Sequence, residues 1–259
     1  MTANNLTTLS LNNRIAVITG AKQGIGAAVA IGFARRGAKV VLWDWADIKE
    51  ASELIAKVNK YCDDVLYMQV DVSDQSAVTK AAERTLNHFE KVDVLVNNAA
   101  IYPRTPFLEM TFEEWQKVVD ISLSGSWLCA KAFVPNMINQ SYGKIINVSS
   151  ILFVLGAPDF SHYIPAKAGV IGLTRSLARE LGVHGIRVNA VMPGAIQTEG
   201  ELRDFPDQEN ISRILNEKQC LPGRIKPEHI EPTFAFLAGS SSDPITGQTI
   251  NVDHGWCFR

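Results

Sequence analysis

Short apolar runs alternate with amphipathic segments along most of the chain. The apolar runs, rich in β-branched residues, lie at 14–19, 39–44, 65–71, 92–97, 144–148, 187–192 and 248–252. Segments with apolar residues at helical spacing lie at 27–36, 51–61, 75–89, 113–139, 163–181 and 228–237. Nearly continuous apolar strands that alternate with helices are typical of a parallel sheet covered on both faces. The pattern predicts an α/β fold with a doubly wound parallel sheet.

This alternation continues to the end of the chain with one interruption. The 259 residues, 46% of them hydrophobic, suffice for one large domain or two small ones. No internal repeat, low-complexity segment or linker divides them, so we predict a single domain over residues 1–259. The interruption is a polar, charged segment at about 198–220, directly after a strand. We expect this segment to form a lid over a substrate; the alternative is a solvated loop.

The balance of charges argues against two classes of partner. Lys and Arg number 25 and Asp and Glu 27, which gives a net charge of −2 with the signs interspersed. Neither nucleic acid nor an anionic membrane is therefore an expected partner. Residues 1–13 are polar, and no apolar run approaches the ~20 residues that span a bilayer. We expect a cytoplasmic protein.

Cysteine and histidine positions indicate neither a disulfide framework nor a metal site. The five histidines show no ligand spacing, and the four cysteines form no CxxC motif. The cysteines are Cys62, Cys129, Cys220 and Cys257. We expect four reduced thiols and no metal.

A glycine-rich turn follows the first predicted strand and precedes the first predicted helix. Its glycines are Gly20, Gly24 and Gly26, in the spacing GxxxGxG. Such a turn leaves backbone N–H groups free at the positive end of a helix, where a pyrophosphate can bind. Glycines alone are weak evidence, because a tight turn often needs them for the backbone. The turn predicts a dinucleotide site.

The second predicted strand ends in a carboxylate, Asp44, eighteen residues after Gly26. An acid about 20 residues beyond the glycine turn accepts hydrogen bonds from the adenosine ribose and repels a 2′-phosphate. Lys22 would soften that repulsion, but the next residue is the neutral Gln23. We therefore expect NAD rather than NADP. The alternative is that Asp44 caps a helix from about Asp47.

Three side chains point to proton transfer. Tyr163 and Lys167 stand four positions apart, on one face of a predicted helix, and Pro165 is tolerated in its first turn. An ammonium close by would lower the phenol pKa from its usual value near ~10 and so make a usable base. Ser150, after a strand, would hydrogen-bond the same substrate oxygen. The alternative is a lysine that snorkels beside a half-buried ring.

In combination, these motifs resemble the classical short-chain dehydrogenases/reductases, over nearly the whole chain. The matching pieces are Thr19-Gly20-x-x-x-Gly24-Ile25-Gly26, Asp71-Val72, Asn97-Asn98-Ala99, Ser150, Tyr163-x-x-x-Lys167, Pro193-Gly194 and Ile245-Thr246-Gly247. The resemblance implies a Rossmann-type fold of about seven strands flanked by helices. It also implies hydride transfer between a nicotinamide and a carbinol carbon while the tyrosine carries the proton.

The resemblance implies roles for further residues. Asp71 and Val72 would hold the adenine, Asn98 the adenosine ribose, and Lys167 the nicotinamide ribose. Ile196 and Thr198 would secure the nicotinamide amide. The full expected cofactor set is Gly20, Gln23, Gly24, Ile25, Gly26, Asp44, Asp71, Val72, Asn98, Tyr163, Lys167, Pro193, Gly194, Ile196 and Thr198.

The chain departs from the family pattern in three places. Ser122 stands where relatives usually have an Asn that holds a relay water, so we include it with Ser150, Tyr163 and Lys167 in the catalytic set. A serine can bond back into its own helix, which would leave the relay in altered form. Ala100 and His254 replace usual glycines near the cleft.

The substrate residues give a mixed indication. Tyr102, Leu152 and Phe153 suit an apolar or aromatic alcohol, and Trp256 is a further candidate. In contrast, Arg104, His162 and the charged segment 198–220 suit a sugar, including one with an acidic group that Arg104 would hold. Each of these residues has an alternative role in packing or as surface charge.

We therefore expect an NAD-dependent oxidoreductase that acts on a secondary alcohol, a ketone or a sugar hydroxyl of a small molecule. An aldose 1-dehydrogenase, for a neutral or acidic sugar, and an aryl or alkyl carbinol dehydrogenase are the alternatives. The non-enzymatic alternative is a catalytically dead NAD-binding regulator. Apolar stripes at 115–137 and 170–181, whose family counterparts pack between subunits, predict a homotetramer or homodimer; the alternative is that both face the chain's own sheet.

Overall fold

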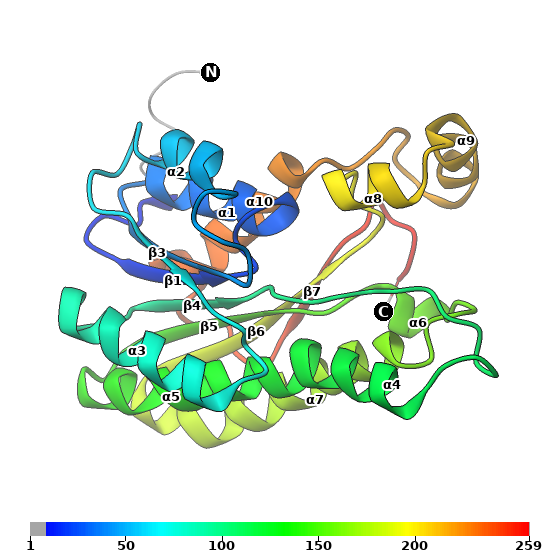
Figure 1. Cartoon of the computed structure of the whole chain (residues 1–259). Coiled ribbons are helices and arrows are strands. Elements are labelled where there is room, and N and C mark those ends of the chain that lie inside the picture. Colours follow the sequence, from blue (N-terminus) through cyan, green and yellow to red (C-terminus); the bar gives the residue numbers. More distant parts are fainter. Residues whose placement is uncertain (1–8, 259) are drawn as a thin grey trace.

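The computed structural model describes residues 9–258, in which one sheet of seven parallel strands runs through the molecule (Figure 1). Residues 1–8, and with them most of the polar segment 1–13, lie outside the described residues, as does residue 259. The strand order is β3-β2-β1-β4-β5-β6-β7. The strands are β1 (Ile15–Thr19), β2 (Lys39–Asp44), β3 (Leu66–Gln69), β4 (Val94–Asn97), β5 (Gly143–Val148), β6 (Ile186–Pro193) and β7 (Thr249–Val252).

The strand order reverses between β1 and β4. From β1 the chain first adds β2 and β3 on one side, and then β4 to β7 on the other. At such a reversal the loops after the two central strands diverge, and a crevice opens at their carboxyl ends. The glycine turn follows β1, and Asn98 follows β4. The topology thus brings two predicted cofactor elements to the place where ligands bind in sheets of this kind.

Helices cover both faces of the sheet. Figure 1 shows α1, α2 and α10 on one face, α3, α5 and α7 on the other, and α8 and α9 at one end of the molecule. The helices are α1 (Gly24–Arg35), α2 (Ser52–Val58), α3 (Gln75–Phe89), α4 (Phe112–Val119), α5 (Gly125–Asn139), α6 (Leu152–Leu155), α7 (Tyr163–Leu181), α8 (Glu199–Asp204), α9 (Gln208–Lys218) and α10 (Pro227–Ala238).

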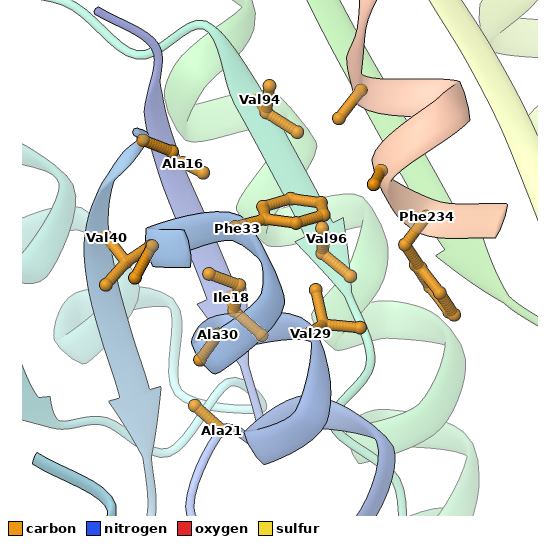
Figure 2. Packing of buried hydrophobic residues seen from close by; sticks show 14 of the residues in the cluster. Ala16, Ile18, Ala21, Val29, Ala30, Phe33, Val40, Val94, Val96 and Phe234 are labelled. Carbon is orange, nitrogen blue, oxygen red and sulfur yellow. The ribbon is translucent and has the colours of Figure 1, made fainter. Parts of the chain in front are cut away.

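The core under α1 positions the start of that helix. Phe33 of α1 and Phe234 of α10 are fully buried with Ile18 of β1 and Val96 of β4 (Figure 2). Burial of each such side chain stabilises the fold by about 1.5–3 kcal/mol. These contacts hold α1 against the strand that leads into the glycine turn, so its first residue, Gly24, has a fixed place in the crevice.

The predicted doubly wound parallel sheet is confirmed. All seven strands lie within two residues of their predicted ends. Two shorter features differ from the prediction. The segment 198–220 contains α8 and α9, so it is not an irregular loop, and its role as a lid stays a prediction. The four-residue helix α6 was not predicted because it is shorter than a helical repeat can reveal.

The predicted helix 113–139 is present, with one irregularity that the sequence did not predict. It consists of α4, a π-helical turn at Asp120–Ser124, and α5. A π-turn widens a helix by one residue, and the apolar spacing in sequence does not reveal it. Ser122 lies inside this turn.

Within residues 9–258, no helix combines the length and the apolar character needed to cross a bilayer. In the same residues no three His, Cys, Asp or Glu side chains gather in a group that could hold a metal ion. The four cysteines are free thiols, two of them buried.

Candidate active site

Ser150, Tyr163 and Lys167 converge at the carboxyl end of β5. Ser150 lies two residues beyond that strand, and Tyr163 is the first residue of α7. A hydrogen bond joins the side chains of Ser150 and Tyr163. Lys167 donates from Nζ to the Val148 carbonyl at 2.7 Å, and Nζ lies 5.7 Å from the centre of the Tyr163 ring. The strand end and the first turn of α7 thus bring together the three residues predicted for proton transfer.

The electrostatics of the pair differ from the expected effect. Burial raises the pKa of Tyr163 to about 12, against an opposing effect from the hydrogen bond with Ser150. Burial lowers the pKa of Lys167 to about 8. The predicted lowering of the phenol pKa by the ammonium is absent here, because desolvation dominates at this buried site. At neutral pH the phenol is therefore protonated, the form that can donate a proton to a carbonyl.

Ser122 does not make the bond that we expected of it. Its side chain is fully buried in the π-turn, and Oγ has no hydrogen-bond partner among the described residues. The Ser122 carbonyl accepts a hydrogen bond from Ser126 Oγ at 3.4 Å. The expected bond from Ser122 back into its own helix is therefore wrong, and a buried hydroxyl remains free to bind a water.

The glycine turn leaves no room for side chains. Gly20 and Gly24 have φ of +61° and +58°, which favours glycine. A Cβ on Gly26 would lie 2.2 Å from the Gly20 carbonyl oxygen. The Asn98 side-chain amide donates to the carbonyls of Thr19 and Gly20 at 3.0 and 2.9 Å. Asn98 therefore positions the turn, and its predicted contact with the ribose stays a prediction.

The start of α1 already binds an anion of the protein itself. The Gly24 N–H donates to Oε2 of Glu199, the first residue of α8, at 3.0 Å. Gln23, at the N-cap, makes no side-chain hydrogen bond to the helix. A carboxylate at this position shows that the glycine turn and the helix start fit an anionic group, as the predicted dinucleotide requires. Ile25 is partly exposed beside it.

Asp44 is buried at the end of β2. Its carboxylate accepts hydrogen bonds from the backbone N–H of Lys22 at 2.9 Å and of Ala46 at 3.1 Å. The helix α2 begins only at Ser52, so the alternative that Asp44 caps a helix is wrong. Lys22 Nζ lies 2.5 Å from a carboxylate oxygen of Glu50. The lysine is thus partly neutralised and directed to Glu50.

The predicted adenine residues lie just after β3. Asp71 is exposed and accepts hydrogen bonds from the backbone N–H and the hydroxyl of Ser73. Val72 is buried against Gly125, where an added Cβ would approach Val72 Cγ2 to 2.8 Å. Val72 therefore packs the segment after β3 against the start of α5.

The predicted nicotinamide residues follow β6. Pro193 ends the strand, and the Gly194 N–H donates to the Val252 carbonyl at 2.9 Å. Ile196 is buried and forms a parallel bridge with Ile225. Thr198 caps α8, since its Oγ1 accepts from the Glu201 N–H at 3.1 Å.

Aromatic rings line the approach to Tyr163. The ring centres of Tyr102 and Phe160 lie 6.2 and 6.0 Å from that of Tyr163. The Arg104 guanidinium lies 5.7 Å from the centre of Phe160 and 5.4 Å from that of Phe205, just after α8. Phe160 and Phe205 were not among the predicted residues. Phe160, three positions before Tyr163, could have been inferred from that spacing, whereas only the fold brings Phe205 here.

The other substrate candidates have different surroundings. His162 is fully buried, and its Nδ1 accepts from the Tyr163 N–H at 2.8 Å. His162 thus caps the start of α7, and its predicted contact with the substrate stays a prediction. Leu152 and Phe153 begin α6 and are half-buried, and Lys218 Nζ lies 5.7 Å from the Trp256 ring centre.

Comparisons with known proteins agree with this architecture. The family model described as Enoyl-(Acyl carrier protein) reductase matches residues 20–257. A 3-oxoacyl-[acyl-carrier-protein] reductase of Synechocystis sp. is 39% identical over 252 residues, 95% of this chain and 98% of that protein. The 2-dehydro-3-deoxy-D-gluconate 5-dehydrogenase of Dickeya dadantii is 34% identical over 256 residues, 98% of this chain and 99% of that protein.

A solved structure of similar sequence has the same fold. The crystal structure of a short-chain type dehydrogenase/reductase from Mycobacterium marinum superposes with a TM-score of 0.89 at 30% identity. The match covers 97% of this chain and 98% of that one. The chain belongs to the short-chain dehydrogenase/reductase family of oxidoreductases, which bind a nicotinamide cofactor and act on CH–OH or keto groups.

Proposed function

We propose that the chain is an NAD-dependent dehydrogenase or reductase of a small molecule with a secondary alcohol, ketone or sugar hydroxyl. The observation that supports this most is the convergence of Ser150, Tyr163 and Lys167, with a direct hydrogen bond between the serine and the tyrosine. A dead NAD-binding regulator would not require that arrangement. We also propose a cytoplasmic location, on the sequence argument alone.

In the proposed reaction Tyr163 carries the proton. For reduction, the phenol donates its proton to the carbonyl oxygen of the substrate; for oxidation, the phenolate takes the hydroxyl proton. Ser150 hydrogen-bonds the same oxygen and orients it toward Tyr163. Lys167, whose Nζ lies 5.7 Å from the centre of the Tyr163 ring, is the nearby group that supplies or accepts the proton. A bound nicotinamide would supply the hydride, with its two electrons, to the carbonyl carbon in reduction and accept it from the carbinol carbon in oxidation.

The choice of NAD rests on Asp44. Its buried carboxylate lies at the end of β2, and Lys22, the nearby cation, is directed to Glu50. A 2′-phosphate would meet the like charge of Asp44, while the nearby Lys22 is paired with Glu50. We expect kcat/KM to be at least about tenfold higher with NAD than with NADP, or about 1.4 kcal/mol.

The test of this choice is Asp44→Asn, which removes the charge and keeps one of the two acceptor oxygens used by the backbone N–H groups of Lys22 and Ala46. Steady-state kinetics should show a narrower preference for NAD. Asp47→Asn makes the same change in charge at an exposed site, where the carboxylate accepts from the Lys49 N–H, and should leave the preference for NAD unchanged. Equal or better use of NADP by the unaltered protein would refute the assignment.

For the substrate we favour a hydroxy or keto compound with an acidic group, such as a sugar acid. The support is Arg104, whose guanidinium lies 5.7 Å from the centre of the Phe160 ring, which in turn lies 6.0 Å from that of Tyr163. Arg104 pairs with Asp159 at 3.4 Å, and a substrate carboxylate would compete with that exposed ion pair. A guanidinium there can bind a carboxylate through two parallel hydrogen bonds. The relative from Dickeya dadantii is named for a sugar acid, and the one from Synechocystis for an acyl thioester.

A panel of aldonic acids, aldoses and aryl carbinols separates these alternatives, with NADH formation as the readout. Turnover of acids alone, with a KM that rises about tenfold or more in Arg104→Ala, supports the acidic substrate. Turnover of aldoses that is unaffected by Arg104→Ala supports an aldose 1-dehydrogenase. Turnover of carbinols that is unaffected by this change supports a carbinol dehydrogenase. Tight NADH binding without turnover of any compound would favour the regulator.

A further inference from the structure

A carboxylate of the segment 198–220 occupies the start of α1. Glu199 is separated from Gly24 by 175 positions, yet its Oε2 accepts from the Gly24 N–H at 3.0 Å. Thr198 also approaches this residue: an added Cβ on Gly24 would lie 3.1 Å from Thr198 Cγ2. Thr198, the N-cap of α8, and Glu199, its first residue, therefore pack on Gly24, the first residue of α1.

This position suits an anion for two reasons. The first N–H groups of a helix have no partner within the helix, and the helix start carries a partial positive charge. In most helices an N-cap side chain supplies the missing acceptor, but Gln23 makes no such bond here. Glu199 supplies it instead, from another part of the chain.

The carboxylate can leave without unfolding of its own segment. Glu199 is exposed overall, so its long side chain can rotate into solvent. The rest of α8 is held separately: Arg224 bonds Glu201 at 2.6 Å and Gln208 at 2.7 Å, and both charged side chains of that pair are largely buried. Thr198 also caps the helix independently of Glu199.

We propose that Glu199 is an internal competitor of the cofactor's pyrophosphate at the start of α1. Two anions cannot share the same N–H groups without strong repulsion, so the carboxylate has to rotate away before the dinucleotide binds. Glu199 thereby lowers the affinity for the cofactor, while α8 itself stays in place. This proposal rests on the nicotinamide-binding site of the family, and not on the choice of NAD or of substrate.

The test is the affinity of Glu199→Gln for ligands with and without a pyrophosphate, measured by calorimetry. Removing a charge at a helix start changes binding by about 0.3–1 kcal/mol, so Kd for NADH and for ADP-ribose should fall about two- to fivefold. Adenosine, which lacks phosphate, should bind with unchanged Kd. Glu199→Asp keeps the charge but shortens the side chain, and should give a smaller decrease.

The matched control is Glu209→Gln, which makes the same change in charge on an exposed residue in the first turn of α9. It should alter none of the three dissociation constants. Equal Kd for ADP-ribose in the unaltered protein and in Glu199→Gln, or weaker binding by the variant, would overturn the proposal. If the unaltered protein binds neither NADH nor ADP-ribose while Glu199→Gln binds both, the competition is stronger than proposed and the proposal stands. If neither protein binds them, the cofactor site itself is absent and the proposal falls with it.

Discussion

Burial and hydrogen bonding act on the Tyr163 phenol in opposite directions, and burial has the larger effect. The pKa of the phenol is raised to about 12, so it is protonated over the whole neutral range. Only the ionised form can take a proton from an alcohol. The rate of alcohol oxidation should therefore rise with pH through the neutral and alkaline range, whereas carbonyl reduction, which uses the protonated form, should lack this rise.

Tyr163→Phe removes only the hydroxyl and tests this role directly. We expect kcat to fall by about 10²–10⁴-fold and the rise with pH to disappear, with NADH affinity within about twofold of the original. Tyr61→Phe removes the hydroxyl of an exposed tyrosine that follows α2, and should change neither the rate of alcohol oxidation nor that of carbonyl reduction. Retention of more than about a tenth of the turnover by Tyr163→Phe would exclude the proposed mechanism.

At the scale of elements, one ion pair joins α1 to α10 on the face of the sheet that carries the glycine turn. Arg36 Nη1 lies 2.7 Å from Glu231 Oε1, and both side chains are about nine-tenths buried. Gly32 makes room for it, since an added Cβ there would lie 2.1 Å from the Glu231 carboxylate. Burial raises the pKa of Glu231, and the Arg36 guanidinium opposes that effect.

Glu231→Ala leaves the arginine buried without its partner. We expect the free energy of unfolding to fall by about 3–5 kcal/mol, because an uncompensated buried charge is costly. Urea denaturation measures this loss. The control is Glu83→Ala on α3, where the carboxylate is exposed and the change should stay within about 0.5 kcal/mol. A loss below about 1 kcal/mol in Glu231→Ala would show that the pair contributes little.

At the scale of the whole molecule, α4 and α5 present aromatic rings to the outside. Phe112 is 70% exposed and stacks on Trp115 with ring centres 6.0 Å apart, and Trp127 of α5 is 47% exposed. The opposite side of α5 buries Cys129 and Phe133 against the sheet. The sheet therefore accounts for only part of the predicted apolar stripe. Large exposed rings of this kind favour an interface, and we propose a homodimer or homotetramer.

Light scattering at micromolar concentration should give a mass of two or four chains. Trp127→Glu places a charge in the proposed interface and should reduce that mass to one chain, or from four chains to two. Ile48→Glu makes a comparable change at an exposed apolar residue outside both stripes and should leave the mass unchanged. A single-chain mass for the unaltered protein would contradict the assembly.

Much of the architecture was determined by local sequence alone. Each strand is a short apolar run with polar or glycine ends, and such a run can be buried on both faces only in a covered parallel sheet. The glycine turn, Asp44, and the spacing from Tyr163 to Lys167 are also local, because each depends on neighbours in the chain or on a strand end. For this reason the family and the main cofactor and proton-transfer candidates could be predicted before the fold was seen.

The tertiary structure decided what depends on residues far apart in the chain. Glu199 meets Gly24 because the segments after β6 and β1 converge at the carboxyl end of the sheet. Arg104 lies near Phe160 and Phe205 because the segments after β4, β5 and β6 converge there. The π-turn at Ser122 and the burial of His162 also depend on packing. Burial likewise set the pKa values of Tyr163 and Lys167 against the sequence expectation, since desolvation is a property of the folded surroundings and not of the spacing between two residues.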